Sequence, residues 1–127
     1  MIFIDYSFLL ALIHKNNKHH QIAIEIAKNI KDEKKITTDL IVSDILSKVS
    51  QLKNNETTKL IYDYIKDNHI VYETSIEDFD KAISYNDENK KSSFKQSIII
   101  GVMNKLNINR IASFSNDFEK KGFNRIF

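Results

Sequence analysis

The sequence contains no cysteine, no proline, no tryptophan and only two glycines. Without cysteine, a disulfide framework, a thiolate metal site and a cysteine nucleophile are all excluded. With so little proline and glycine, the connections must be short turns built from Asn, Asp, Ser and Lys. A metal site would therefore use oxygen or histidine ligands, and the four histidines show no ligand spacing with the acids.

The charges are nearly balanced, with 19 basic and 17 acidic residues and a net charge of +2. This small excess is compatible with a nucleic-acid partner but is too weak to indicate one by itself. The apolar run at residues 1–13 includes Asp5, has no basic segment before it and lacks a small-residue cleavage site. We therefore expect one cytoplasmic domain over residues 1–127, with no signal peptide and no membrane association.

Asp5 is the only charged residue in this opening run. The β-branched and aromatic residues before it predict a strand over residues 2–5, and the apolar spacing after it predicts a helix over residues 6–13. Open α/β sheets hold their active sites at the carboxyl ends of strands, which is where Asp5 falls. Asp is also a favoured helix N-cap. From this residue alone, both interpretations stay open.

Strands and helices are predicted to alternate along the whole chain. The apolar spacing predicts further strands over residues 36–38, 69–73, 110–114 and 124–127. It predicts helices over residues 22–30, from residue 39, around residues 60–65, over residues 76–83 and 94–106, and from residue 115. This order indicates an α/β fold of three-layer α/β/α architecture, with a central parallel sheet of four to five strands. Right-handed crossovers bring the carboxyl ends of the first, second and fourth strands to one edge.

Three of these helices carry expectations about packing. Ile76, Phe79 and Ile83 are predicted to form the buried face of their helix. Gly101 lowers helix propensity, and we expect a close approach to the sheet to compensate for it. The helix around residue 60 has its own apolar stripe, formed by Leu60, Ile61, Tyr64 and Ile65.

Two more carboxylates are predicted near the same sheet edge as Asp5. Asp44 flanks the apolar stripe of the helix after the second strand, and Asp117 follows the fourth strand. Carboxylates that converge from separate elements bind Mg²⁺ or Mn²⁺, which activate water for phosphoryl displacement. Each acid also has a structural interpretation, because Asp117 could complement a helix dipole and Asp44 could pair with Lys48 at i+4.

The order and spacing of five segments resemble the PIN domains, and within them the single-domain VapC-like ribonuclease toxins. The similar segments are residues 2–12, 19–27, 37–46, 92–97 and 114–123. The resemblance covers nearly the whole chain. It implies cleavage of RNA by three or four acids that hold a divalent metal, Mg²⁺ or Mn²⁺. It also implies a small antitoxin protein as partner and a homodimer through the helices after the second and third strands.

Position by position, the resemblance keeps only part of the acidic site. The first acid is Asp5, and the second, usually Glu, is Asp44. The third and fourth, usually Asp, are replaced by Gln96 and Ser115, with Asp117 a third acid only if it turns inward. A helper Thr is replaced by Tyr6, whereas the hydroxyl of Ser7 is kept.

These replacements predict weaker metal binding, because an amide or hydroxyl oxygen ligates a hard cation without charge. Gln96 also completes a capping box with Ser93, and Ser115 is a plausible N-cap for the last helix. Two hypotheses follow: a weak metal-dependent ribonuclease, or a non-catalytic module that binds RNA or a protein. The lysines at positions 90, 91 and 95 could meet phosphate or simply be solvated.

An alternative outside this family is a doubly wound module of the receiver or flavodoxin type. Such a module also has an acid at the end of its first strand. Receivers carry a phosphoacceptor Asp after the third strand, and the segment Glu73-Thr74-Ser75 supplies none. The PIN-like interpretation is therefore favoured.

Overall fold

The computed structural model describes residues 1–88 and 93–127, and these form alternating strands and helices. The order agrees with the predicted one, with boundaries shifted by a few residues. The elements are β1 (Ile2–Ile4), α1 (Tyr6–Ile13), α2 (His20–Asn29), β2 (Lys35–Thr38), α3 (Asp39–Leu52), α4 (Asn55–Asn68), β3 (Ile70–Tyr72), α5 (Ile76–Glu88), α6 (Phe94–Lys105), β4 (Arg110–Ala112), α7 (Asp117–Lys120) and β5 (Asn124–Ile126).

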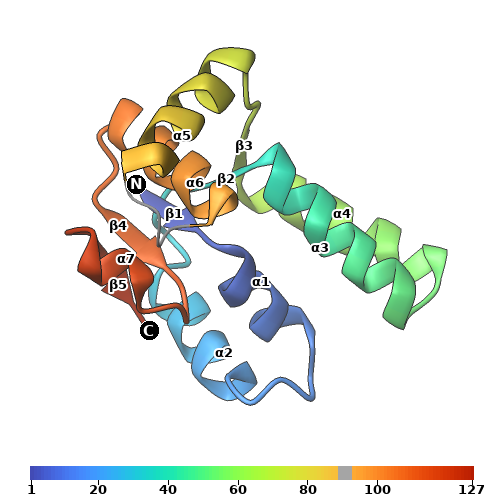
Figure 1. Ribbon diagram of the computed structural model, residues 1–127. Coiled ribbons are helices and arrows are strands. Elements are labelled where there is room, and N and C mark those ends of the chain that lie inside the picture. Colours follow the sequence, from blue (N-terminus) through green and yellow to red (C-terminus); the bar gives the residue numbers. More distant parts are fainter. Residues whose placement is uncertain (89–92) are drawn as a thin grey trace.

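The five strands form one sheet in the order β3-β2-β1-β4-β5, and every neighbouring pair is parallel. In Figure 1, α5 and α6 lie on one side of the strands, α1 and α2 lie on the other, and α3 and α4 form a projecting hairpin. The predicted α/β fold with a central parallel sheet is confirmed. Because all strands point the same way, their carboxyl ends meet at one edge.

The central strand of the sheet, β1, is fully buried. All three residues of β1 are completely buried, as expected for the middle strand of a parallel sheet covered on both faces. The buried hydroxyl of Thr37 in β2 donates to the carbonyl of Ile4 at 2.9 Å, so this polar side chain is satisfied inside the core. Helix α6 is buried on most of its surface, and its Ile98-Ile99-Ile100 run is helical rather than extended.

The predicted buried face of α5 is wrong for two of its three residues. Ile76 and Ile83 are 75% and 54% exposed, whereas Asp78 and Ala82 are buried. The Asp78 carboxylate accepts hydrogen bonds from the backbone and hydroxyl of Ser75 at the start of the helix. It also accepts one from the Tyr72 hydroxyl. This network holds Asp78 on the inner side of α5, which apolar spacing alone could not reveal.

Two other packing predictions also need correction. In α4, Ile65 is buried and Ile61 packs against the core, but Leu60 and Tyr64 are exposed. Gly101 makes no close approach, because a Cβ atom added there would meet nothing within 4 Å. No helix in the described part of the chain is long and apolar enough to span a bilayer.

Candidate functional site at the carboxyl edge of the sheet

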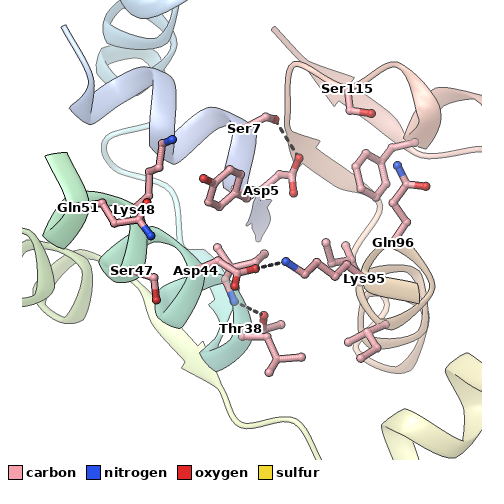
Figure 2. A pocket seen from close by; sticks show the side chains of 16 residues that line it. Asp5, Ser7, Thr38, Asp44, Ser47, Lys48, Gln51, Lys95, Gln96 and Ser115 are labelled. Atoms are coloured by element: carbon pink, nitrogen blue, oxygen red, sulfur yellow. Dashed lines mark hydrogen bonds and ion pairs between the residues drawn. The ribbon is translucent and has the colours of Figure 1, made fainter. Parts of the chain in front are cut away.

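A cleft of about 480 Å³ lies where β1 and β2 end, between α3 and α6. Figure 2 shows α3 on one side of this cleft and α6 on the other, with Asp5 between them. The polar residues that line the cleft are Asp5, Tyr6, Ser7, Thr38, Asp44, Ser47, Lys48, Gln51, Lys95, Gln96 and Ser115. Of the residues predicted to lie at this edge of the parallel sheet, Asp5, Asp44, Gln96 and Ser115 line the cleft.

Asp5 is positioned by β1 and by the start of α1. It occupies the N-cap position of α1, but its side chain makes no capping hydrogen bond. Asp5 is only 7% exposed, and its carboxylate accepts hydrogen bonds from Ser7 Oγ at 2.9 Å and Ser113 Oγ at 2.7 Å. Both donors bind Oδ2, which leaves Oδ1 without a donor from the described residues. The side chain is therefore held by hydroxyls rather than used as a helix cap.

Ser113 is a site residue that the sequence reasoning did not identify. It is fully buried directly after β4, and its Oγ accepts a hydrogen bond from the Ser115 backbone at 3.0 Å. Ser7 Oγ accepts one from the Phe114 backbone at 3.0 Å. The two hydroxyls thus tie the β1–α1 junction to the loop after β4. The available signal was a hydroxyl at the end of a strand that points to the same sheet edge as Asp5.

Asp44 faces the cleft from α3, and its ion-pair partner comes from the opposite wall. Lys95 of α6 places Nζ 2.6 Å from Asp44 Oδ2, as drawn in Figure 2. The Lys95 side chain is 72% exposed and that of Asp44 is 37% exposed. Lys48 lines the same cleft. The predicted i+4 pair between Asp44 and Lys48 is therefore replaced by a pair that spans the cleft.

Asp117 lies beside the cleft and turns toward two of its lining residues. Its Oδ2 accepts from Gln96 Nε2 at 2.6 Å and from Ser115 Oγ at 3.2 Å. The bond from Gln96 lowers the pKa of Asp117 most strongly; partial burial opposes this, and Ser115, Lys120 and Lys121 lower the pKa further. Asp117 is therefore ionised at neutral pH. Its carboxylate contacts Gln96 and Ser115, the two positions at which the resemblance expects acids.

Gln96 makes both hydrogen bonds of the capping box that the sequence predicts with Ser93. Its backbone N–H donates to Ser93 Oγ at 3.2 Å, and its Oε1 accepts from the Ser93 backbone at 3.3 Å. The predicted capping box is therefore confirmed. The predicted N-cap at Ser115 is wrong, because α7 begins at Asp117 and its N-cap is Asn116. Ser115 Oγ instead accepts from the Asp117 backbone two residues on, at 3.4 Å.

These donors and acceptors do not fit a preformed metal site of three carboxylates. In the described ranges, no three His, Asp or Glu side chains lie together as a metal-binding group. Asp44 is paired with Lys95, and Asp117 is bound by Gln96. The cleft is instead lined by two lysines and several hydroxyl residues beside the carboxylates of Asp5 and Asp44. Positions 90 and 91, whose lysines were candidates for phosphate contacts, lie outside the described residues.

A family model and a solved structure match this chain. The family model for the PIN domain matches residues 2–124. Among solved structures, the fold is similar to that of VapC20 from Mycobacterium tuberculosis, a toxin that cleaves the sarcin-ricin loop. The TM-score is 0.82 at 18% sequence identity, and the match covers 97% of this chain and 96% of that one. A search of curated proteins gave no match.

Proposed function

Because this chain belongs to the PIN-domain family, we propose that it is a VapC-like toxin ribonuclease whose RNA-cleaving activity is reduced or lost. The observation that carries the proposal is the cleft at the carboxyl edge of the sheet. It is lined by Asp5 and Asp44, which the resemblance matches to the first and second acidic positions, and by Gln96 and Ser115, which it matches to the third and fourth. The same cleft therefore retains the means to hold RNA while it lacks two of the usual negative charges.

The cleft residues suit single-stranded RNA in three ways. Lys48 and Lys95 line it and supply cations for phosphate groups. Tyr6, half-buried beside Asp5, presents an aromatic ring on which a base can stack. Asp5 is already oriented by Ser7 and Ser113. Its other oxygen, Oδ1, can therefore accept a proton or a hydrogen bond from a hydroxyl group without rearrangement. Mg²⁺ or Mn²⁺ binding would rest on Asp5 and Asp44, with Asp117 nearby, and should be weak.

A second candidate is a non-catalytic PIN-like module that binds RNA or a protein in this cleft. It is favoured by the two contacts at 2.6 Å that occupy the remaining acids, from Lys95 to Asp44 and from Gln96 to Asp117. In this candidate the cleft keeps its shape and its cations, but Asp5 alone is left to carry chemistry.

RNA cleavage and RNA binding separate these candidates. Purified protein should be titrated with a labelled single-stranded RNA, and cleavage should be followed with Mn²⁺ and with a chelator. Asp5→Asn is the test variant, and Asp32→Asn, an exposed site away from the cleft, is the matched control. Slow metal-dependent cleavage that only Asp5→Asn abolishes supports the ribonuclease. RNA binding without cleavage supports the binding module. If the protein neither binds nor cleaves RNA, the proposal of an RNA-binding cleft is wrong.

The proposal includes a cytoplasmic location, a small antitoxin as partner and a homodimer. Support for the protein contacts comes from large apolar side chains that α3, α4 and α5 expose, namely Leu52, Leu60, Tyr64, Ile76 and Ile83. Clusters of exposed apolar residues mark protein interaction sites more often than single ones do. Light scattering on the purified protein tests the homodimer, and a monomer at all concentrations would contradict it.

A further inference from the structure

The ion pair between Lys95 and Asp44 is unusual for its position. It joins α6 to α3 across the cleft, with Nζ 2.6 Å from Oδ2. Lys48 stands at i+4 on the same helix as Asp44, which is the local spacing for a helical ion pair. The structure nevertheless gives Asp44 its cation from the opposite wall. A partner that is distant in sequence, chosen over an adjacent one, points to an arrangement specific to this cleft.

Gln96, the next residue on α6, also donates a hydrogen bond to a carboxylate. Gln96 donates its amide hydrogen to Asp117 at 2.6 Å, while Lys95 donates to Asp44. The first turn of α6 therefore presents hydrogen-bond donors to two carboxylates, one of which lines the cleft. A divalent cation needs acceptors at such positions. This turn supplies the opposite chemistry, which accounts for the misfit between the cleft and a metal site of three carboxylates.

We propose that Lys95 is a built-in counter-ion of the cleft, which neutralises Asp44 and competes with divalent cations for its carboxylate. The inference rests on the proposed function, because a divalent cation matters here only if the cleft is of the nuclease type. In this arrangement the charge of Asp44 is balanced from within the chain. A cation that binds Asp5 and Asp44 must displace the ammonium group and then tolerate its positive charge nearby.

The size of the effect follows from the exposure of the pair. Because both side chains are accessible to water, the direct ion pair alone weakens a competing cation by at most about fivefold. Repulsion between the ammonium group and a divalent ion adds to this, and both terms decrease with salt. Removing the charge of Lys95 should therefore tighten divalent binding by roughly three- to tenfold. The gain should shrink as the ionic strength rises.

The test is a Mn²⁺ titration of RNA-free protein, followed by calorimetry or by the electron paramagnetic resonance signal of free Mn²⁺. Lys95→Met removes the charge and keeps a long apolar stem. Lys48→Met is the matched control, because Lys48 lines the same cleft on the other wall. Both changes are repeated in an Asp44→Asn background to form a double-mutant cycle. Circular dichroism verifies that each variant is folded.

Tighter Mn²⁺ binding by Lys95→Met, a change of less than about twofold for Lys48→Met, and loss of the gain in the Asp44→Asn background support the proposal. Unchanged or weaker binding by Lys95→Met overturns it. An equal gain from Lys48→Met also overturns it, because the effect would then be a general one of cleft charge. If neither the wild type nor Lys95→Met binds at millimolar Mn²⁺, the proposal fails as well. RNA binding and cleavage are measured separately, so the proposed function can fail while this inference stands, or the reverse.

Discussion

Replacing Gln96 and Ser115 together by aspartate should rebuild the missing acidic positions. In the wild type these two side chains donate to Asp117 Oδ2 at 2.6 Å and 3.2 Å. The double variant removes both donors and surrounds Asp117 with carboxylates. Because divalent cations bind such clusters strongly, we expect Mn²⁺ affinity to rise well beyond the effect of any single lysine substitution.

The cost in the absence of metal can be worked out from the same contacts. Two unit charges about 4 Å apart repel by about 1 kcal/mol in water, and Asp117 is partly exposed to solvent, so we take this value for each new charge pair. Together with the two lost hydrogen bonds, the free energy of unfolding should fall by roughly 2–4 kcal/mol. For a domain of this size, the melting temperature should drop by about 10 °C. Mn²⁺ at a hundredfold excess over its dissociation constant restores about 2.7 kcal/mol.

Thermal melting with and without Mn²⁺ measures both effects. The matched control is Gln21→Asp with Ser84→Asp, which makes the same change in charge at exposed positions away from the cleft. The control should melt at nearly the same temperature with and without Mn²⁺. If the cleft variant is as insensitive to Mn²⁺ as the control, the assignment of Gln96 and Ser115 to the third and fourth acidic positions is wrong.

Three further predictions concern stability. Gly101→Ala should raise the free energy of unfolding by about 0.5–1 kcal/mol in thermal melting, because a Cβ meets nothing within 4 Å and the unfolded chain loses freedom. Thr38→Ala should lower it by about 1 kcal/mol in urea unfolding, because α3 loses the N-cap bond from Ile41 N at 3.2 Å. Burial opposes the ionisation of Asp78, but bonds from the backbone and hydroxyl of Ser75 and from the Tyr72 hydroxyl prevail and hold its pKa below the ordinary 3.8. Its stabilisation is complete above that ordinary pKa and is lost as the pH falls through the lowered value, so wild type should lose more stability than Asp78→Asn between pH 7 and acid.

The architecture was predictable because its signals are local. Each strand is a short apolar run, and each helix repeats apolar residues at a spacing that the chain itself displays. Which side of a helix is buried was less certain. Ile76 and Ile83 have the spacing of a core face, yet the hydrogen bonds of Asp78 turn that face outward.

In the site, too, the residues marked by a local sequence pattern were predictable, and the contacts between distant segments were not. Asp5 could be located because it ends a strand, and the capping box of Ser93 and Gln96 is a pattern of four consecutive residues. The contact of Lys95 with Asp44 joins two helices that are far apart in the sequence, and no local sequence pattern predicts it. Ser113 was missed for the same reason, since its bond to Asp5 exists only after β1 and β4 have paired.

The pairing of β1 with β4 also sets the order in which the molecule can be assembled. The central strand, residues 2–4, is completed only when residues 110–112 are available to lie beside it. Contacts so distant in sequence form late and slow the folding of a domain. During synthesis on the ribosome the cleft therefore stays incomplete until residue 113 has been made, because the hydrogen bond from Ser113 to Asp5 cannot form earlier. The cleft is therefore completed late, as a property of the paired strands and not of the N-terminal segment that carries Asp5.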